Sequence, residues 1–340
     1  MKNICFISVY IFSMALSACL PDKNLLVPDV KESLAQHLFE AANSRDMIHN
    51  PVNNTLYISN GAEVLHYDMA NGALLDTISL GGELIGMDIS PDHSQIAVAD
   101  DVVTGGFVKI HLLDTKTHAS SVLTIPSASG ESGTYSIAYT DNNNLLSTSD
   151  YSGSGRVPFR YIDLTNETVS FENSINKRSM LSKNADHSLV TFSQSNNSSG
   201  PYGIYNPSTL SMALNASAGA FLYDIAIDRS SSFLAVPTYQ SLRFYDVSGN
   251  LMDTFPAATY GAPLGVAYNP VKDLLYVPWA GTSLIGVFNA LDHSFIENHS
   301  IPYTFTWHGN WGMNDGHIKI SADGTQAFVQ VSSGIYSFKL

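Results

Sequence analysis

Cysteine is scarce in this chain of 340 residues, which contains only Cys5 and Cys19. Both lie at the extreme N-terminus, so residues 20–340 can form neither a disulfide bond nor a metal site built from thiolates. A body of roughly 300 residues does not need such crosslinks, because a chain of that length buries about three quarters of its surface on folding. Packing must therefore provide the stability of the folded protein.

Charged residues are also few, and make up 14% of the chain against about 25% in an average soluble domain. There are 30 acidic and 16 basic residues, for a net charge of −14. Nucleic-acid binding needs clustered Lys and Arg, and the sequence has no such cluster. We therefore expect no nucleic-acid partner. Ser, Thr, Asn and Gly fill the polar positions, which favours turn-rich β structure.

The motifs of common catalytic and nucleotide-binding sites are missing. The chain has no P-loop, no His-Glu-x-x-His zinc motif and no Gly-x-Ser-x-Gly nucleophile elbow. Gly153-Ser154-Gly155 has neither the strand nor the helix that would make it a phosphate-binding turn, so we interpret it as a loop. These absences favour a protein without a catalytic centre and without a cofactor.

The hydrophobic run at the N-terminus is short and informative. Met1-Lys2-Asn3 precedes thirteen mostly apolar residues, Ile4 to Leu16, and a membrane-spanning helix needs ~20. A basic start, a short apolar core and small residues before a break are typical of a signal peptide. The run ends in Leu16-Ser17-Ala18-Cys19, which resembles the bacterial lipobox.

The lipobox resemblance implies that residues 1–18 are removed and that Cys19 carries a diacylglycerol and an acylated amino group. Two or three acyl chains hold a protein on a membrane stably, whereas one chain binds only marginally. Leu20 stands where an aspartate would retain such a protein in the inner membrane. The resemblance thus implies a lipid-anchored protein of the cell envelope, with the outer membrane favoured. The alternative is an ordinary secretory signal cut nearby, with Cys19 incidental.

The rest of the chain contains an internal repeat. Each unit has an apolar strand, a turn of Asn, Asp, Pro or Ser, a second apolar strand, a looser loop, and a third strand that ends in Asp or Asn. Seven such turns, with a mean spacing of about 45 residues, begin at Asn50, Ser90, Thr140, Asn184, Asp228, Asn269 and Ser321. Propeller blades have a period of ~40–50 residues. The repeat therefore predicts a single propeller of seven four-stranded blades.

A second landmark recurs independently at the end of the third strand. It is an Asp or Asn followed by a polar turn, and it occurs at Asp68, Asp114, Asp163, Asn206, Asp246 and Asn289. Such side chains accept hydrogen bonds from backbone N–H groups ahead of them. We therefore expect each to form the corner of a hairpin.

The first unit resembles the YVTN repeat. Asn54-Thr55-Leu56-Tyr57-Ile58-Ser59-Asn60 is followed by Val64 to Asp68 and by Asn71-Gly72, which is similar to the "lYVtN" strand and the "vyDl-tG" strand and turn of that family. A weaker match to the same strand is Leu274-Leu275-Tyr276-Val277-Pro278. The resemblance implies an all-β propeller over residues 45–340. It also implies an alternative function, because YVTN-like propellers resemble lactonases and quinoprotein or amine dehydrogenase subunits.

The last unit contains only three strands, so a closed ring needs one strand from residues 19–44. Leu25-Leu26-Val27 is one candidate for this strand. Val30, Leu34 and Leu38 recur at four-residue spacing, which instead predicts a short helix over residues 29–42. Both predictions can hold together, with residues 20–24 as a tether.

In a propeller, the loops between the second and third strands and the loops between blades share one face around the central channel. Eight residues that the repeat assigns to these loops form our predicted binding surface: Asp100, Asp150, Tyr239, Tyr260, Trp279, Trp307, His308 and Trp311. The last three belong to the unusually long segment 303–317. Aromatic rings with polar edges are typical of contact sites for proteins, peptides and sugars. The alternative is that the rings pack inside the channel or between blades.

Two groups of polar residues could have a chemical role. Asp100, Asp101 and Asp150 have the carboxylate oxygens that Ca²⁺ prefers, although solvated loop carboxylates are more common. His308 and His317, with Asp315 between them, could form a metal or acid–base site, but they lack the fixed spacing of a helical metal motif. We predict no metal ion in either place.

Two classes of function remain. We favour a non-catalytic, monomeric lipoprotein that presents the loop face to a protein, peptide or glycan. The alternative is a propeller enzyme, in which Asp150, His308 and His317 would be the available groups. That alternative rests on fold analogy. A deep polar funnel with charged groups pointing inward would favour the enzyme, and a shallow aromatic surface would favour binding.

Replacing Cys19 by Ser should move the protein from the membrane fraction to the soluble periplasm, because the substitution removes the thiol that takes the lipid. Fractionation and labelling with palmitate measure this. Cys5→Ser is the matched control, since Cys5 lies in the segment expected to be cleaved, and both readouts should stay at wild-type levels. A Cys19→Ser protein that still sediments with membranes, together with an unlabelled wild type, would show that the lipobox prediction is wrong.

Overall fold

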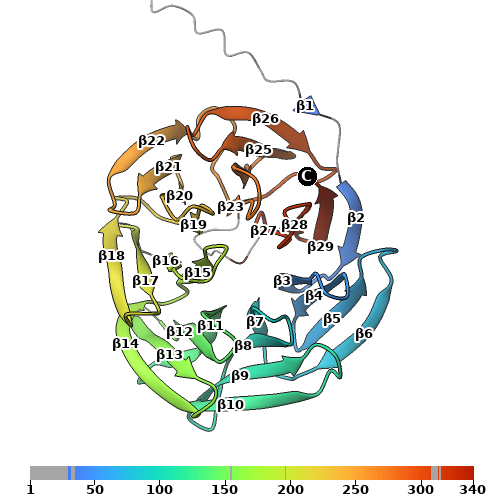
Figure 1. The fold of residues 1–340 in the computed structure, drawn as a ribbon, viewed down its shortest axis with the longest axis vertical. Coiled ribbons are helices and arrows are strands. Elements are labelled where there is room, and N and C mark those ends of the chain that lie inside the picture. Colours follow the sequence, from blue (N-terminus) through green and yellow to red (C-terminus); the bar gives the residue numbers. More distant parts are fainter. Residues whose placement is uncertain (1–29, 32–34, 154, 196, 308–312, 314) are drawn as a thin grey trace, which may run out of the picture.

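The computed structural model describes residues 30, 31 and 35–340, except 154, 196, 308–312 and 314. Over these residues the protein is all-β, and its strands form seven sheets arranged around a central axis as a propeller (Figure 1). The predicted fold class is confirmed. The described part of the chain has no helix that is long and apolar enough to cross a membrane. Cys19 and the expected signal peptide lie outside the described residues.

Each blade contains four antiparallel strands, ordered from an inner strand at the axis to an outer strand at the rim. Blades 1 and 2 consist of β3 (Ser44–Asn50), β4 (Thr55–Asn60), β5 (Glu63–Asp68) and β6 (Leu74–Ser79), and of β7 (Leu84–Ile89), β8 (Gln95–Thr104), β9 (Phe107–Asp114) and β10 (Ser120–Pro126). Blades 3 and 4 consist of β11 (Glu131–Tyr139), β12 (Asn144–Tyr151), β13 (Arg156–Asp163) and β14 (Thr168–Asn176), and of β15 (Met180–Lys183), β16 (Val190–Ser193), β17 (Pro201–Asn206) and β18 (Ser211–Ser217).

Blades 5 to 7 complete the ring. Blade 5 consists of β19 (Ala226–Ile227), β20 (Phe233–Thr238), β21 (Ser241–Asp246) and β22 (Leu251–Pro256), and blade 6 of β23 (Ala267–Tyr268), β24 (Leu274–Pro278), β25 (Leu284–Asn289) and β26 (Phe295–Ser300). Blade 7 consists of β27 (Ile318–Ile320), β28 (Gln326–Val331), β29 (Gly334–Lys339) and β2 (Ala35–Glu40). A short strand, β1 (Val30–Lys31), adds to the outer edge of blade 6 in parallel with β26.

The polar turns form where the sequence predicts them, and their side chains hold them in place. In every turn between a first and a second strand, an Asp or Asn carboxyl or amide oxygen accepts the N–H two residues ahead. These residues are Asn50, Asp92, Asp141, Asp186, Asp228, Asn269 and Asp323. The same bond follows all six predicted third-strand ends, from Asp68 to Asn289. This local bond fixes the register of each hairpin.

The ring closes through a strand from residues 19–44, as predicted, but this strand is β2 and not the candidate Leu25–Val27. β2 pairs antiparallel with β29, from Ala35 opposite Phe338 to Glu40 opposite Gly334. A helix over 29–42 is therefore wrong for the described residues, and Leu25–Val27 lies outside them. The free edge of β29 offers a row of backbone hydrogen bonds, which outweigh a weak helical pattern in so short a segment.

The closing strand approaches β29 very closely at one glycine. Gly334 has φ +147°, and a Cβ atom there would clash with the carbonyl oxygen of Phe39 and the amide of Ala41. Phe39 is buried in the core that blade 7 shares with blade 1. Gly334 is thus required both by its backbone conformation and by its contact with the closing strand.

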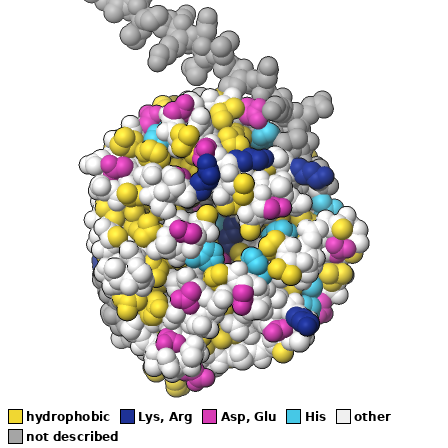
Figure 2. All heavy atoms as spheres, viewed as in Figure 1, with side chains coloured by type: hydrophobic (Ala, Val, Ile, Leu, Met, Phe, Trp, Pro, Cys, Tyr) yellow, Lys and Arg dark blue, Asp and Glu magenta, His cyan; other side chains and the backbone are white. Residues whose placement is uncertain are grey.

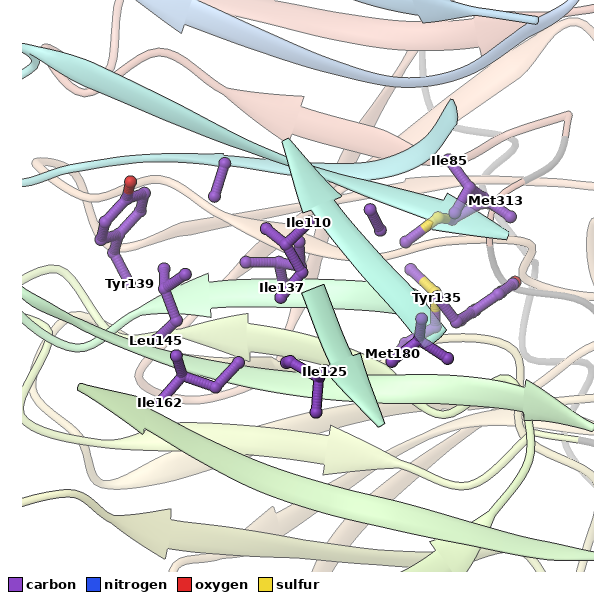
Figure 3. Packing of buried hydrophobic residues seen from close by; sticks show 13 residues of the cluster. Ile85, Ile110, Ile125, Tyr135, Ile137, Tyr139, Leu145, Ile162, Met180 and Met313 are labelled. Carbon is purple, nitrogen blue, oxygen red and sulfur yellow. The ribbon is translucent and has the colours of Figure 1, made fainter. Parts of the chain in front are cut away.

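The hydrophobic core lies between neighbouring blades, because the face of each twisted sheet packs against the next sheet. Figure 3 shows one such cluster, in which Ile110 of β9 meets Ile137 of β11 and Leu145 of β12. All three side chains are buried. Each buried aliphatic side chain contributes about 1.5–3 kcal/mol relative to the exposed state, so this interlayer packing provides much of the stability that disulfides would otherwise give.

The inner strands expose one unpaired edge toward the axis, and polar side chains of the preceding blade satisfy part of it. Asp46 of blade 1 accepts the N–H of Met87 in blade 2 at 2.7 Å, and Asp88 of blade 2 accepts the N–H of Tyr139 in blade 3 at 2.7 Å. Asp224, just before β19 in blade 5, accepts the N–H of Val266 in blade 6 at 3.3 Å. Three buried carboxylates thereby link blades around the channel.

Replacing Gly334 by Ala should lower the melting temperature by about 5–10 °C, because the methyl group strains the backbone and pushes the closing strand away from β29. Thermal unfolding followed by circular dichroism measures this. The control is Gly105→Ala, which also has a positive φ but open space around the added methyl group. Equal, small losses in both variants would contradict the proposed role of the contact in ring closure.

Candidate functional site

The direction of the strands defines two faces of the ring. Within each blade the first strand runs from the blade-joining loop to the first turn, and the second strand runs back. The blade-joining loops and the second-to-third-strand loops therefore share one face, the loop face. The first-to-second-strand turns share the opposite face, the turn face, which is where the principal cavity opens.

Trp279 does not contribute to an exposed surface on the loop face. Its side chain is 0% exposed and packs against Phe255, Tyr260 and Phe288 in the core between blades 5 and 6. The assignment of Trp279 to a loop after the second strand is correct, but the prediction that it forms a binding surface is wrong. Tyr260 covers the same aromatic cluster and is half-buried. These two rings follow the alternative of packing between blades.

Asp100 and Asp150 are also buried; Asp100 lies within β8, and Asp150 lies near the end of β12. Asp100 accepts hydrogen bonds from the N–H groups of Glu83 and Val102 and lies 3.4 Å from the imidazole of His111. Asp150 forms an ion pair of 2.7 Å with Arg178. Both carboxylates therefore bond to partners within the protein. The prediction of an acidic, solvent-facing loop surface at these two residues is wrong.

Tyr239 and Trp307 are the predicted residues that remain exposed. Their side chains are 55% and 48% exposed, and their ring centroids lie 5.8 Å apart. The indole N–H of Trp307 donates to the hydroxyl of buried Tyr223 at 3.2 Å, so the ring is held in place. His308 and Trp311 lie outside the described residues. The exposed aromatic surface thus comprises two described rings and not the larger group that we predicted.

The described residues of the connection from blade 6 to blade 7 contact several other blades. Trp307 contacts blade 5, as described above, while Met313 is buried against Ile85, Tyr135 and Met180 of blades 2, 3 and 4 (Figure 3). The chain then returns to blade 7 at His317 and β27. Both contacts lie on the loop face, where we expected the binding site.

A cavity of about 490 Å³ occupies the channel on the turn face, with lining residues from all seven blades. Figure 2 shows this face, with a hollow near its centre that has Lys or Arg at its base and histidines around it. This volume lies in the ~300–1,000 Å³ range of small-molecule sites. The cavity is therefore the candidate functional site.

Two lysines of the inner strands lie in this cavity, and each is paired with an acid of another blade. Nζ of Lys183 in blade 4 is 2.6 Å from Oδ2 of Asp88 in blade 2. Nζ of Lys319 in blade 7 is 2.6 Å from Oδ1 of Asp46 in blade 1. These acids also receive the backbone N–H groups of the next blade, so each ion pair connects three blades across the channel.

His317 forms the deepest part of this charged network. Its Nε2 is 3.2 Å from Oδ1 of Asp46, and its Nδ1 is 3.7 Å from Oδ2 of Asp224. Burial disfavours the charged imidazole, but the two carboxylates outweigh burial and raise the pKa of His317 to about 9. Burial likewise opposes the charge of Asp46, but Lys319 and His317 lower its pKa to about 2. At neutral pH these groups form an ionised bridge between blades 1, 5 and 7.

Two further histidines line the cavity from equivalent turns. His93 and His187 are the middle residues of Asp-His-Ser sequences in the first turns of blades 2 and 4, with φ of +60° and +63°. Burial, reinforced by the charge of Lys183, lowers the pKa of His93 and lowers that of His187 to about 4. Both imidazoles are therefore neutral at pH 7. The cavity presents ammonium groups beside neutral aromatic rings.

The sequence contains a signal for this site that we did not use. Inner strands line the channel, and four of them contain a charged residue that takes part in this network: Asp46, Asp88, Lys183 and Lys319. A charged residue at such a position must find a partner on another blade. The sequence-based prediction placed the site on the loop face, where propeller sites usually lie. The cavity opens at the opposite end of the channel.

Known proteins resemble this chain in fold but not in sequence. No protein-family model matches it, and no curated protein matches it. The β-propeller domain of Cps50 (Swd1) from Myceliophteria thermophila has a TM-score of 0.69 at 9% identity, over 90% of this chain and 99% of that chain. Hydrazine synthase from Kuenenia stuttgartiensis has a TM-score of 0.65 at 11% identity, over 90% and 97%.

A third structure, the Dos1 propeller, has a TM-score of 0.67 at 15% identity, over 87% of this chain and 77% of that chain. Likeness at these identities establishes the β-propeller fold and nothing finer. The chain is thus a seven-bladed β-propeller with a charged central cavity, and the resemblance of its first unit to the YVTN repeat stays a prediction.

The bridge at His317 predicts a pH dependence of stability. Its folded pKa of about 9 exceeds the ordinary 6.5, so its stabilising effect is complete below pH ~6.5 and is lost as the pH rises to ~9. A shift of this size corresponds to about 3 kcal/mol. In His317→Gln, the melting temperature at pH 6 should fall, and the decline between pH 6.5 and 9 should flatten relative to wild type. Parallel wild-type and variant curves would contradict the bridge.

Proposed function

We propose that this protein is a lipid-anchored binding protein of the bacterial cell envelope whose propeller holds a small ligand in the central cavity of the turn face. The observation that carries the proposal is the convergence of residues from all seven blades on one concave site, with the charged side chains of Lys183 and Lys319 among them. A few oriented polar groups in a mostly apolar cavity are typical of small-molecule sites. Propeller folds are compatible with binding and scaffold functions of this kind.

The position of the tether fits this proposal. Val30 pairs with Asn298 at the outer edge of blade 6. The eleven residues from Cys19 to Val30 reach at most ~40 Å when extended. A lipid on Cys19 would therefore be linked to the ring at the rim of blade 6.

The loop face is a weaker candidate for the ligand site than the sequence indicates. A protein, peptide or glycan partner there would have Tyr239 and Trp307 as its described aromatic contacts, because Trp279, Asp100 and Asp150 are buried. An isolated exposed pair of rings is common on protein surfaces. We therefore propose the cavity as the ligand site, with the loop face as the alternative.

Catalysis is the second candidate function, and the charged polar funnel of the cavity favours it. His317 and Asp46 are poor proton carriers near neutral pH, because pKa values of about 9 and about 2 keep both ionised. His187, with a pKa of about 4, is a neutral but weak base. Turnover of a lactone or ester that is abolished in His187→Gln would establish an enzyme. A ligand that is released unchanged would establish a binding protein.

A bulky side chain at the mouth of the cavity should abolish ligand binding without unfolding the protein. Ala185 is exposed on the first turn of blade 4 and lines the cavity, so Ala185→Trp places an indole across the entrance. Ligand-detected NMR with a set of anionic, neutral and cationic small molecules measures binding to the wild type and to the variant.

The matched control is Val52→Trp, because Val52 is 74% exposed on the first turn of blade 1 and is not among the residues that line the cavity. Compounds that bind the wild type should bind this control and fail to bind Ala185→Trp. If no compound binds the wild type, or if Ala185→Trp retains its ligands, the cavity is not the ligand site.

A further inference from the structure

The ionic groups of the cavity differ in how far they reach into it. The Lys319 side chain is 28% exposed, while its partner Asp46 is 2% exposed. The Lys183 side chain is 19% exposed, while its partner Asp88 is 9% exposed. Both lysines line the cavity. Although acidic residues outnumber basic ones almost two to one in the chain, the accessible charge at this site is mainly positive.

Backbone hydrogen bonds explain why the carboxylates are withdrawn. Asp46 accepts the N–H groups of Met47 and Met87, and Asp88 accepts that of Tyr139. Asp224 accepts the N–H groups of Ile225 and Val266. These bonds turn the acidic oxygens toward the wall of the channel, where they are unable to contact a ligand without breaking a link between blades.

The two ammonium groups have hydrogen-bonding capacity left over. An ammonium group has three N–H donors. Lys183 uses one on Asp88 and one on the carbonyl oxygen of Ile89 at 3.3 Å. Lys319 uses one on Asp46 and one on the carbonyl oxygen of Met87 at 3.2 Å. Each lysine therefore has one N–H donor without a partner among the described residues, on a side chain that is partly open to the cavity.

The charge balance limits how much negative charge a ligand can bring. Lys183, Lys319 and protonated His317 are already balanced by three carboxylates in the network. Burial lowers the pKa of Lys183 and the charge of Lys319 lowers it further, against the opposing effect of Asp88, so one more anion near these lysines is favourable. For a dianion, the free-energy cost of losing hydration would exceed the electrostatic stabilisation that this network provides.

The remaining lining is suited to an apolar body. Ile89, Ile227, Tyr268 and Phe328 line the cavity beside the neutral rings of His93 and His187. Apolar walls with a few convergent donors are the usual composition of sites for small organic acids and related metabolites. The site therefore combines two cationic donors with an apolar wall, against which the apolar part of a ligand would be buried away from water.

We propose that the cavity binds a small organic acid with a single carboxylate, whose oxygens accept hydrogen bonds from Lys183 and Lys319 and whose apolar part lies against Ile227, Tyr268 and Phe328. The proposal rests on the proposed function, because it assigns the chemical class of the ligand to the same cavity. The ligand enters from the turn face, where the cavity opens.

Four probes of similar shape test the charge requirement: phenylacetate, phenylacetamide, phenethylamine and phenyl phosphate. Dissociation constants are measured by ligand-detected NMR titration of the mature chain at pH 7. Phenylacetate should bind at least tenfold more tightly than the neutral amide, and phenethylamine should not bind. If the amide or the amine binds as tightly as phenylacetate, or if phenyl phosphate binds more tightly, the proposal of a carboxylate site is overturned.

The double variant Lys183→Met with Asp88→Asn identifies the group responsible. It removes one cation and its partner together, so no buried charge is left alone, and the Asn oxygen can still accept the N–H of Tyr139. Circular dichroism and the melting temperature check its fold. Phenylacetate binding should weaken at least tenfold, while the weak binding of phenylacetamide should persist.

Lys116→Met is the charge control, because Lys116 is exposed on the outer turn of blade 2 and is not among the cavity-lining residues. It should bind phenylacetate as the wild type does. An unchanged affinity in the folded double variant would overturn the role of Lys183. If neutral or cationic compounds bind and Ala185→Trp blocks them, the cavity is still a ligand site and only the carboxylate proposal fails. If no compound of any charge binds, the proposed function itself fails.

Discussion

Each inner strand of this propeller has one edge without a strand partner, and the arrangement of the whole channel follows from how that edge is satisfied. Asp46, Asp88 and Asp224 accept N–H groups of the next blade. A buried carboxylate is costly unless it is paired, so Lys183, Lys319 and His317 must lie within reach. The carboxylates that link blades therefore require cations in the channel, and these cations give the cavity its accessible positive charge.

The two ends of the channel differ because one blade connection is long. The segment between β26 and β27 brings Met313 against blades 2, 3 and 4. Met313 is buried against these blades on the loop face, and the turn face has a cavity of about 490 Å³. A cation network placed at the base of a one-sided cavity can serve both the rigidity of the ring and the recognition of an anionic group, because each ammonium group has more donors than its structural partner uses.

The sequence predicts those parts of the fold that depend on local chemistry. Asp and Asn at strand ends bond to backbone atoms two residues ahead, so the blade period and the turns are visible without the structure. The sequence predicts a closing strand within residues 19–44 but not its bounds at Ala35–Glu40, because its pairing with β29 joins segments about 300 residues apart. Burial of Trp279, Asp100 and Asp150 depends on packing against other strands and on partners such as Arg178. The difference between the two ends of the channel depends on the connection between β26 and β27, whose sequence does not follow the repeat.

A crystal structure of the mature protein soaked with phenylacetate tests the central claim most directly, because the two candidate surfaces lie on opposite faces of the ring. The account predicts electron density for the ligand in the cavity of the turn face, with its carboxylate within hydrogen-bonding distance of Lys183 and Lys319. Density on the loop face beside Tyr239 and Trp307, or an unoccupied cavity at a saturating concentration of the ligand, would contradict it.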